Sequence, residues 1–293
     1  MSARNAQQYI ISKLFSVAKS VMVCSVFVLG GVSPVFSQSA QPKTALNLAL
    51  LKAAGHNRGA EVKSLLARGA DPNVKVSDVN SPANGYTPIM LLAMHRDMDI
   101  SAIKALQKAG GDINALETTT GQTALMHASL LGAASEVRAL LERGAKVDVA
   151  GSDGDTALTT AAQAGWDEIV RLLLDHSTRV NTQNNLGQTA LLLAASGSHG
   201  PSALAQQFYK RRVRVVQMLL DHGANVNLTA KNGSSPLMAA AYHGNVEMLK
   251  AMLKKHANVT ARDAKGNTAL QIAIRRNQST EVIRLLKGAG TKE

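Results

Sequence analysis

The chain has 293 residues, of which 45% are hydrophobic but only 3% aromatic, and its formal net charge is +12. Its single cysteine, Cys24, lies in a segment that we expect to be removed, so disulfides and cysteine-ligated metal sites are excluded from the mature chain. The positive charge favours solubility and could attract anionic partners, but by itself it is weak evidence for nucleic-acid binding.

Residues 1–37 have the three parts of a secretory signal peptide. A basic segment ends at Lys19, an apolar run follows from Ser20 to Val32, and Val35-Phe36-Ser37 offers small or modest residues before Gln38. The apolar run is shorter than the roughly 20 residues of a membrane-spanning helix, so we expect a cleaved signal, with an uncleaved anchor as the alternative. Cleavage would make the mature protein periplasmic or secreted.

The rest of the chain repeats one pattern. Gly121-Gln122-Thr123-Ala124-Leu125 returns 33 residues later as Gly154-Asp155-Thr156-Ala157-Leu158. Six such Gly-x-Thr or Gly-x-Ser signals occur in register, which predicts stacked copies of one supersecondary element. After a linker at 38–44 we expect a repeat domain over 45–293, with repeats near 45–83, 84–119, 120–152, 153–185, 186–231, 232–264 and 265–293.

Each repeat is predicted to contain a loop and two helices. The Gly allows the loop to turn, and the Thr or Ser two residues later caps the first helix, as Thr123 would. Apolar residues spaced by i, i+3 and i+4 predict a second helix, for example Glu168–Asp175. A left-handed residue is expected to end this helix, at a Gly in three repeats and with strain at another residue in two: Gly144, Gly223, Gly290, Ser177 and His256.

These fragments resemble the ankyrin repeat, whose pattern includes Gly-x-Thr-Pro-Leu-His-x-Ala and Gly-Ala-Asp-Val-Asn. Among the clearest matches are Ser235-Pro236-Leu237 and Gly223-Ala224-Asn225-Val226-Asn227. The resemblance covers about 45–293 in seven repeats and implies an all-α repeat solenoid of helix-loop-helix elements with β-hairpin loops. Every repeat lacks the family's His three residues after the Thr, which we expect to loosen the hydrogen bonding between loop and helix.

Two insertions interrupt the rhythm. The first lengthens the loop Val74–Asn84, and the second adds 13 residues between the helices of the fifth repeat. There Ala203–His222 is predicted to run as one helix, with Phe208 on its apolar face. A basic collar is expected on this helix, formed by Lys210, Arg211, Arg212 and Arg214. Two interpretations stay open: a lengthened second helix with a solvated charged face, or an element that binds a partner or an anionic surface.

The sequence contains no motif for catalysis, for a cofactor or for a metal. Its eight histidines include no His-Glu-x-x-His pattern, and no Gly-x-Ser-x-Gly elbow occurs. We therefore expect a protein that is not an enzyme and that has no cofactor.

The resemblance implies a scaffold that binds a partner protein through a concave surface of hairpin tips and first-helix ends. The implied contacts on that surface are Tyr86, Met94, His95, Gln122, Leu130, Leu131, Asp155, Gln163, Gln188, Tyr242, His243, Arg275 and Arg276. The insertion adds Phe208, Arg211 and Arg212 as candidates. Of these, Met94, Leu130, Leu131 and Tyr242 would be exposed apolar groups, unless they pack on adjacent repeats.

Two alternative functions remain open. One is a secreted effector that uses the same surface on a host protein. The other is an anion or nucleic-acid binder that uses the basic residues 210–214, although nucleic acid is the less favoured partner. In either case we expect a monomer with no stable membrane insertion after signal cleavage.

Overall fold

The computed structural model describes residues 42–78, 81, 83–197 and 203–290. The chain divides into two compact bodies, which we call the N-terminal body (up to Ser152) and the C-terminal body (from Asp153). The expected signal peptide and residues 38–41 of the expected linker lie outside the described residues. The first described helix begins at Pro42, so residues 42–44 of that linker are helical.

Both bodies are built from helices in the part of the chain that the structure describes. The N-terminal body holds α2 (Pro42–Gly55), α3 (Gly59–Ala67), α4 (Pro88–Ala93), α5 (Ile100–Lys108), α6 (Ala124–Leu131) and α7 (Ala134–Glu142). The C-terminal body holds α8 (Ala157–Ala164), α9 (Asp167–Asp175), α10 (Ala190–Ala195), α11 (Ala203–Asp221), α12 (Pro236–His243), α13 (Val246–Lys254), α14 (Ala269–Arg275) and α15 (Thr280–Gly290).

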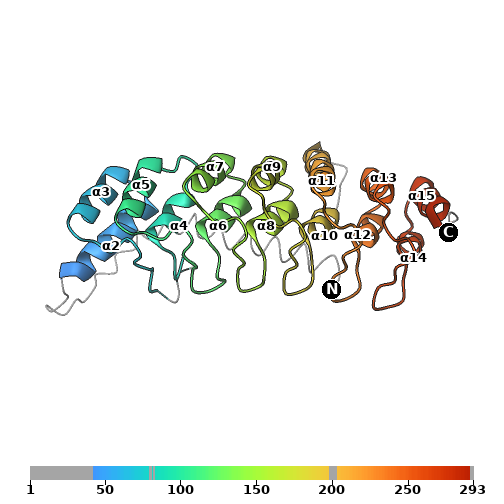
Figure 1. The fold of residues 1–293 in the computed structure, drawn as a ribbon, viewed down its shortest axis with the longest axis horizontal. Coiled ribbons are helices and arrows are strands. Elements are labelled where there is room, and N and C mark those ends of the chain that lie inside the picture. Colours follow the sequence, from blue (N-terminus) through green and yellow to red (C-terminus); the bar gives the residue numbers. More distant parts are fainter. Residues whose placement is uncertain (1–41, 79–80, 82, 198–202, 291–293) are drawn as a thin grey trace. The chain divides into compact units, whose positions relative to one another are not determined.

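Within each body the helices form two rows (Figure 1). In the C-terminal body α8, α10, α12 and α14 contact one another in sequence order and make up one row. The second row is α9, α11, α13 and α15, and each of its members also packs on the first helix of its own repeat. Such stacking of helix pairs on their neighbours is a helical repeat solenoid.

The first helices start where the sequence predicts, because a hydroxyl side chain caps each of them from α4 on. The Thr123 hydroxyl, for example, accepts a hydrogen bond from the Met126 N–H at 3.3 Å. The expected loosening from the missing His is wrong in three repeats, where another side chain accepts the bond from the capping residue's N–H. Met90 Sδ does so for Thr87 at 3.5 Å. The Thr159 hydroxyl does so for Thr156 at 2.7 Å, and Gln271 Oε1 does so for Thr268 at 2.9 Å.

Small residues let the first helices lie close together. The sixth residue after the capping Thr or Ser is Ala93, Ser129, Ala162, Ala195 or Ala241, and each of these side chains has no exposed surface. Larger apolar side chains, mainly Leu, fill the space on either side of these small residues. All six residues of α4 and all six of α10 are therefore buried. An alanine-rich, aromatic-poor composition is therefore what this packing requires.

A side-chain amide joins each loop to the next in the C-terminal body. Asn181 accepts a bond from the Asn225 N–H at 2.7 Å and donates one to the Gly223 carbonyl at 3.2 Å. The next loop repeats the arrangement, since Asn227 bonds the Asn258 N–H at 2.8 Å and the His256 carbonyl at 3.2 Å. We call this series the asparagine ladder.

The same ladder runs through the N-terminal body. Asn73 accepts from the Asp112 N–H at 2.8 Å and donates to the Gly110 carbonyl at 2.8 Å. Asn114 then accepts from the Lys146 N–H at 2.7 Å. Because each amide satisfies backbone groups at the end of the following second helix, it fixes the spacing between repeats.

The second helices end largely where the sequence predicts, with one exception in the last repeat. Helix α11 is one continuous helix, as predicted, and ends one residue earlier than expected. Ser177 and His256 have φ angles of 57° and 59°, so they do take the left-handed cap position. The expectation for Gly290 is wrong, because α15 continues through it. Ala289 is the residue that stands at the register position of Gly144.

The loops expected as β-hairpins contain no strand within the described residues. They are instead held by turns and by single backbone bonds to the next loop. In the C-terminal body the Asn185 N–H donates to the Asp153 carbonyl at 2.8 Å, and the Lys231 N–H donates to the Leu186 carbonyl at 2.9 Å. None of the helices in the described part of the chain combines the length and the apolar composition of a membrane-spanning segment.

We predict that Asn227→Ala lowers the free energy of unfolding of the C-terminal body by about 1 kcal/mol, because two hydrogen bonds between neighbouring loops are lost. Urea unfolding followed by circular dichroism measures the change. Asn232→Ala is the matched control, since its side chain accepts a bond only from Ser234 of its own turn. Equal destabilisation by the two variants would show that the asparagine ladder does not hold the repeats together.

Candidate functional site

Three of the four expected loop contacts are built into the fold. Tyr86, Gln122 and Asp155 are only 5%, 6% and 5% exposed. The Tyr86 ring meets the His127 ring at a 44° tilt with centroids 4.7 Å apart, and the Asp155 carboxylate accepts a bond from Asn184 Nδ2 at 2.9 Å. The expectation that these positions lie at accessible tips is therefore wrong, because all three side chains are buried. Tyr86 meets helix α6, and Asp155 meets the following loop. Gln188, the fourth, is half-buried.

The ends of the first helices in the N-terminal body are also less open than expected. Met94 and Leu130 are 7% and 6% exposed, so these two are packed side chains and not exposed apolar groups. Leu131 is half-buried. His95 is half-buried as well, with its Nε2 3.0 Å from the Gly55 carbonyl, and burial lowers the pKa of its imidazole. This edge therefore offers a partner little apolar surface.

The C-terminal body differs, because its last helix ends carry aromatic and cationic side chains. Arg276 is exposed, and its guanidinium carbon lies 4.4 Å from the centroid of the Tyr242 ring. Tyr242 and His243 are half-buried and meet edge to face with centroids 5.0 Å apart. Gln278 Nε2 donates to the Tyr242 carbonyl at 2.8 Å and fixes this helix end. With exposed Arg275, these groups form the helix-end patch: Tyr242, His243, Arg275 and Arg276.

A second aromatic cluster lies where α11 passes the start of α9. The Trp166 and Phe208 rings are 6.2 Å apart at a steep angle. The Arg211 guanidinium carbon lies 5.6 Å from the Trp166 ring and 5.9 Å from the Phe208 ring. All three residues are half-buried. The sequence indicated Phe208 and Arg211 as candidate contacts and Trp166, at the turn before α9, as a packing residue. Trp166 does pack, and its partners come from α11.

Arg212 contradicts the expected basic collar, because its guanidinium points into the fold. Its Nη2 donates to the Gln163 carbonyl at 2.8 Å and its Nη1 to the Ala194 carbonyl at 3.4 Å. Gly197 leaves room for it, since a Cβ there would lie 1.9 Å from Nη1. Burial lowers the pKa of Arg212 to about 10, so the group stays charged at neutral pH. The negative ends of α8 and α10 thus receive a buried cation.

The other members of the expected collar stay at the surface. Lys210 and Arg214 are exposed, and Arg214 pairs with Asp167 on α9 at 2.6 Å. Gln163, an expected contact, is half-buried and supplies its carbonyl to Arg212. Helix α11 is therefore fixed to α8, α9 and α10 by charged side chains. In the described part of the chain no group of three or more metal-ligating side chains lies together.

We predict that Arg212→Ala destabilises the C-terminal body by about 2 kcal/mol, because two charge-assisted hydrogen bonds to buried carbonyls are lost. Thermal and urea unfolding give the measurement. Arg211→Ala is the control from the neighbouring position, and we expect it to change stability by less than about 1 kcal/mol. A larger effect at position 211 would mean that stacking on Trp166, and not the buried cation, fixes α11.

The family profile described as Ankyrin repeats (3 copies) matches residues 50–150, 139–209 and 203–292. These matches cover all of the described helices except the beginning of α2. Ankyrin repeats generally mediate protein–protein interaction and typically serve as scaffolds that are not enzymes. The stacked helix pairs and the profile agree over the same residues, so the chain belongs to the ankyrin repeat family.

Proposed function

We propose that this protein is a non-enzymatic scaffold that binds a partner protein through the helix-end patch of its C-terminal body. The observation that carries the proposal is the stacking of exposed Arg276 on half-buried Tyr242 at 4.4 Å. Tyr and Arg are the residues most enriched among those that dominate binding energy at protein interfaces. Here the ring is held in place by its neighbours while the guanidinium remains open to solvent.

The partner surface that fits this patch is acidic. Residues 153–293 contain 17 Lys and Arg but 10 Asp and Glu, a net charge of +7, and Arg275 and Arg276 stand side by side at the end of α14. Among the described residues, neither arginine has a carboxylate within ion-pairing distance. Carboxylates of a partner could engage both guanidinium groups, while an apolar side chain packs on Tyr242.

An anion or nucleic-acid binder based on residues 210–214 receives less support. The guanidinium of its central arginine, Arg212, donates hydrogen bonds to carbonyls inside the fold, and Arg214 forms an ion pair with Asp167. A protein secreted to act on a host protein would use the same helix-end patch, so its surface chemistry is the same. The destination of the chain is a separate proposal.

We predict that the double variant Tyr242→Ala/Arg276→Ala loses the partner that wild type retains in affinity capture. The expected reduction in affinity is at least about 30-fold, because an aromatic anchor and its stacked cation are removed together. Captured proteins are identified by mass spectrometry, and the affinity of the recovered partner is measured by calorimetry.

Lys254→Ala/Lys265→Ala is the control, since both lysines are exposed and lie outside the patch. This control removes two charges and leaves the aromatic residues intact. If both double variants retain the same partner with equal affinity, the helix-end patch is not the contact surface. If the recovered ligand is nucleic acid, with affinity that falls steeply as salt rises, the protein-binding proposal fails.

We propose further that the chain is exported, because its first 37 residues have the composition of a signal peptide. Expression of the full chain in a bacterial host should give a mature protein that begins at Gln38 and is found in the periplasm or medium. N-terminal sequencing of each cell fraction makes the measurement. A mature protein that still starts at Met1 or Ser2 would contradict cleavage.

A further inference from the structure

The last repeat of the C-terminal body leaves apolar side chains uncovered on its outer side. Helices α14 and α15 contact α12 and α13 on one side, and no described helix lies on the other (Figure 1). A terminal repeat that faces water normally has a polar outer surface. In this repeat Ile274 is 52% exposed, and Leu270, Ile283 and Leu285 are only half-buried. We call these four residues the end face.

Ile274 stands at the position on which the next repeat usually packs. It is the sixth residue after the capping Thr268, and in the repeat before it that position is Ala241, with no exposed surface. Ala162 and Ala195 occupy it in the two repeats before that, equally buried. The last repeat therefore has a bulky isoleucine where its predecessors have an alanine covered by the following helix.

Two other positions of the end face show the same change in burial. The second residue after the cap is 2%, 1% and 1% exposed in Leu158, Leu191 and Leu237, but half-buried in Leu270. Leu285 is also half-buried, whereas its equivalent in the preceding repeat, Met252, has no exposed surface. The end face thus consists of side chains of core type that no following helix covers among the described residues.

Ile283 also departs from its equivalents in chemistry. The corresponding residue of the preceding repeat is Lys250, whose ammonium bonds Glu281 on α15 at 2.8 Å. That pair shows that the position points toward the following repeat. In α15 it is occupied by an isoleucine, which replaces a charge by an apolar group on the outward side.

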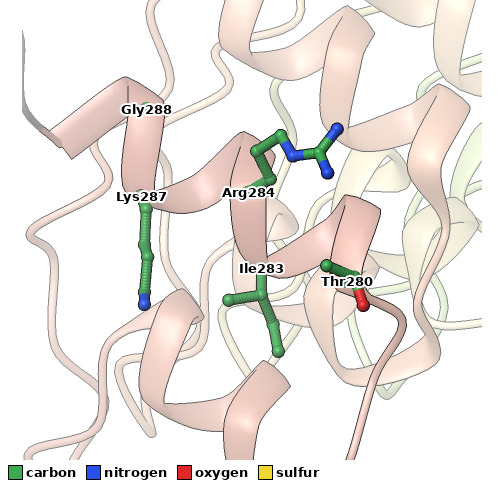
Figure 2. Close-up of a pocket in the computed structure, with 5 residues that line it drawn as sticks. All are labelled: Thr280, Ile283, Arg284, Lys287 and Gly288. Carbon is green, nitrogen blue, oxygen red and sulfur yellow. The ribbon is translucent and has the colours of Figure 1, made fainter.

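A basic rim borders the end face. A shallow hollow on α15 is lined by Ile283 with Arg284, Lys287, Thr280 and Gly288, and Figure 2 shows Ile283 and Lys287 pointing the same way from the helix. Arg284 and Lys287 are exposed. Among the ion pairs of the described residues none involves Arg284 or Lys287, and the one acid of α15, Glu281, is paired with Lys250.

We propose that the end face docks an acidic amphipathic helix of a partner protein. Apolar side chains on one stripe of that helix would cover Ile274 and Ile283, and its flanking carboxylates would meet Arg284 and Lys287. A second copy of this chain fits poorly, because a twofold contact would bring the two basic rims together. This surface shares no residue with the helix-end patch, although Ile274 directly precedes Arg275, and the proposal does not depend on the proposed function.

The test uses the mature chain and two synthetic peptides of about 18 residues, long enough to form helix. One has Leu at i, i+3, i+4 and i+7 with Glu elsewhere, and the other has Lys in place of each Glu. Fluorescence anisotropy gives the affinities, and amide chemical shifts locate the site. We expect the acidic peptide to bind at least about tenfold more tightly than the basic one, with shifts concentrated in α14 and α15.

The variants Ile274→Ala and Ile283→Lys each introduce the residue found in the preceding repeat, so the fold is retained. Each should weaken binding of the acidic peptide by about tenfold, because an apolar anchor is lost. Ile283→Lys also adds a positive charge that attracts the acidic peptide, but we expect the loss of the apolar contact to outweigh it. Leu186→Ala is the control, since Leu186 is also 52% exposed but lies in the loop between α9 and α10. We expect it to leave the affinity within about twofold of wild type.

Four results would overturn the proposal. The first is that the acidic peptide does not bind at millimolar concentration, and the second is that both peptides bind with equal affinity. The third is that the affinity of the acidic peptide is the same for wild type and both isoleucine variants. The fourth is that sedimentation shows a dimer of the chain that Ile274→Ala dissociates. The last result would identify a second copy as the occupant. Since Tyr242 and Arg276 are intact in every variant, none of these outcomes bears on the helix-end patch.

Discussion

The stacking of one first helix on the next is the contact on which the other features depend. It requires a side chain no larger than alanine or serine at the sixth position after the cap, because the helices approach there with no exposed surface left. In the C-terminal body this close approach also brings the loops within reach of one another, so that Asn181 and Asn227 can bond backbone groups of the following repeat. A larger residue inside the array would separate both the helices and the loops.

The sequence was sufficient to predict the elements of each repeat, since these depend on local chemistry repeated in register. The caps at Thr123 and Thr156, the left-handed residues at Ser177 and His256, and the long helix α11 are all found where the pattern placed them. Two expectations of this kind fail. The loops contain no strand among the described residues, and the last repeat has Ala289 at the register position of Gly144, so α15 continues through Gly290.

The candidate site was harder to predict, because exposure depends on which neighbour a side chain meets. Asp155 follows a turn glycine and looks like a solvated loop residue, yet Asn184 of the next loop binds its carboxylate. Arg212 lies in a run of basic residues, 210–214, that suggests a charged surface. Only the position of α11 against α8 and α10 shows that its guanidinium neutralises helix carbonyls. A charge count gives the net field of a segment but not which of its cations are available to a partner.

Departures from a repeat pattern are the informative positions in such a chain, because the pattern itself satisfies the packing that every repeat needs. At Arg212 the departure has an internal explanation, since the inserted residues extend α11 and the arginine fixes it in place. At Ile274 and Ile283 the departure places apolar side chains where no helix among the described residues follows to cover them. Exposed isoleucine at a position where alanine satisfies the fold adds nothing to the stacking and has an unfavourable hydration free energy. The cost is recovered when a partner covers these side chains, which distinguishes the end face from an ordinary solvated helix.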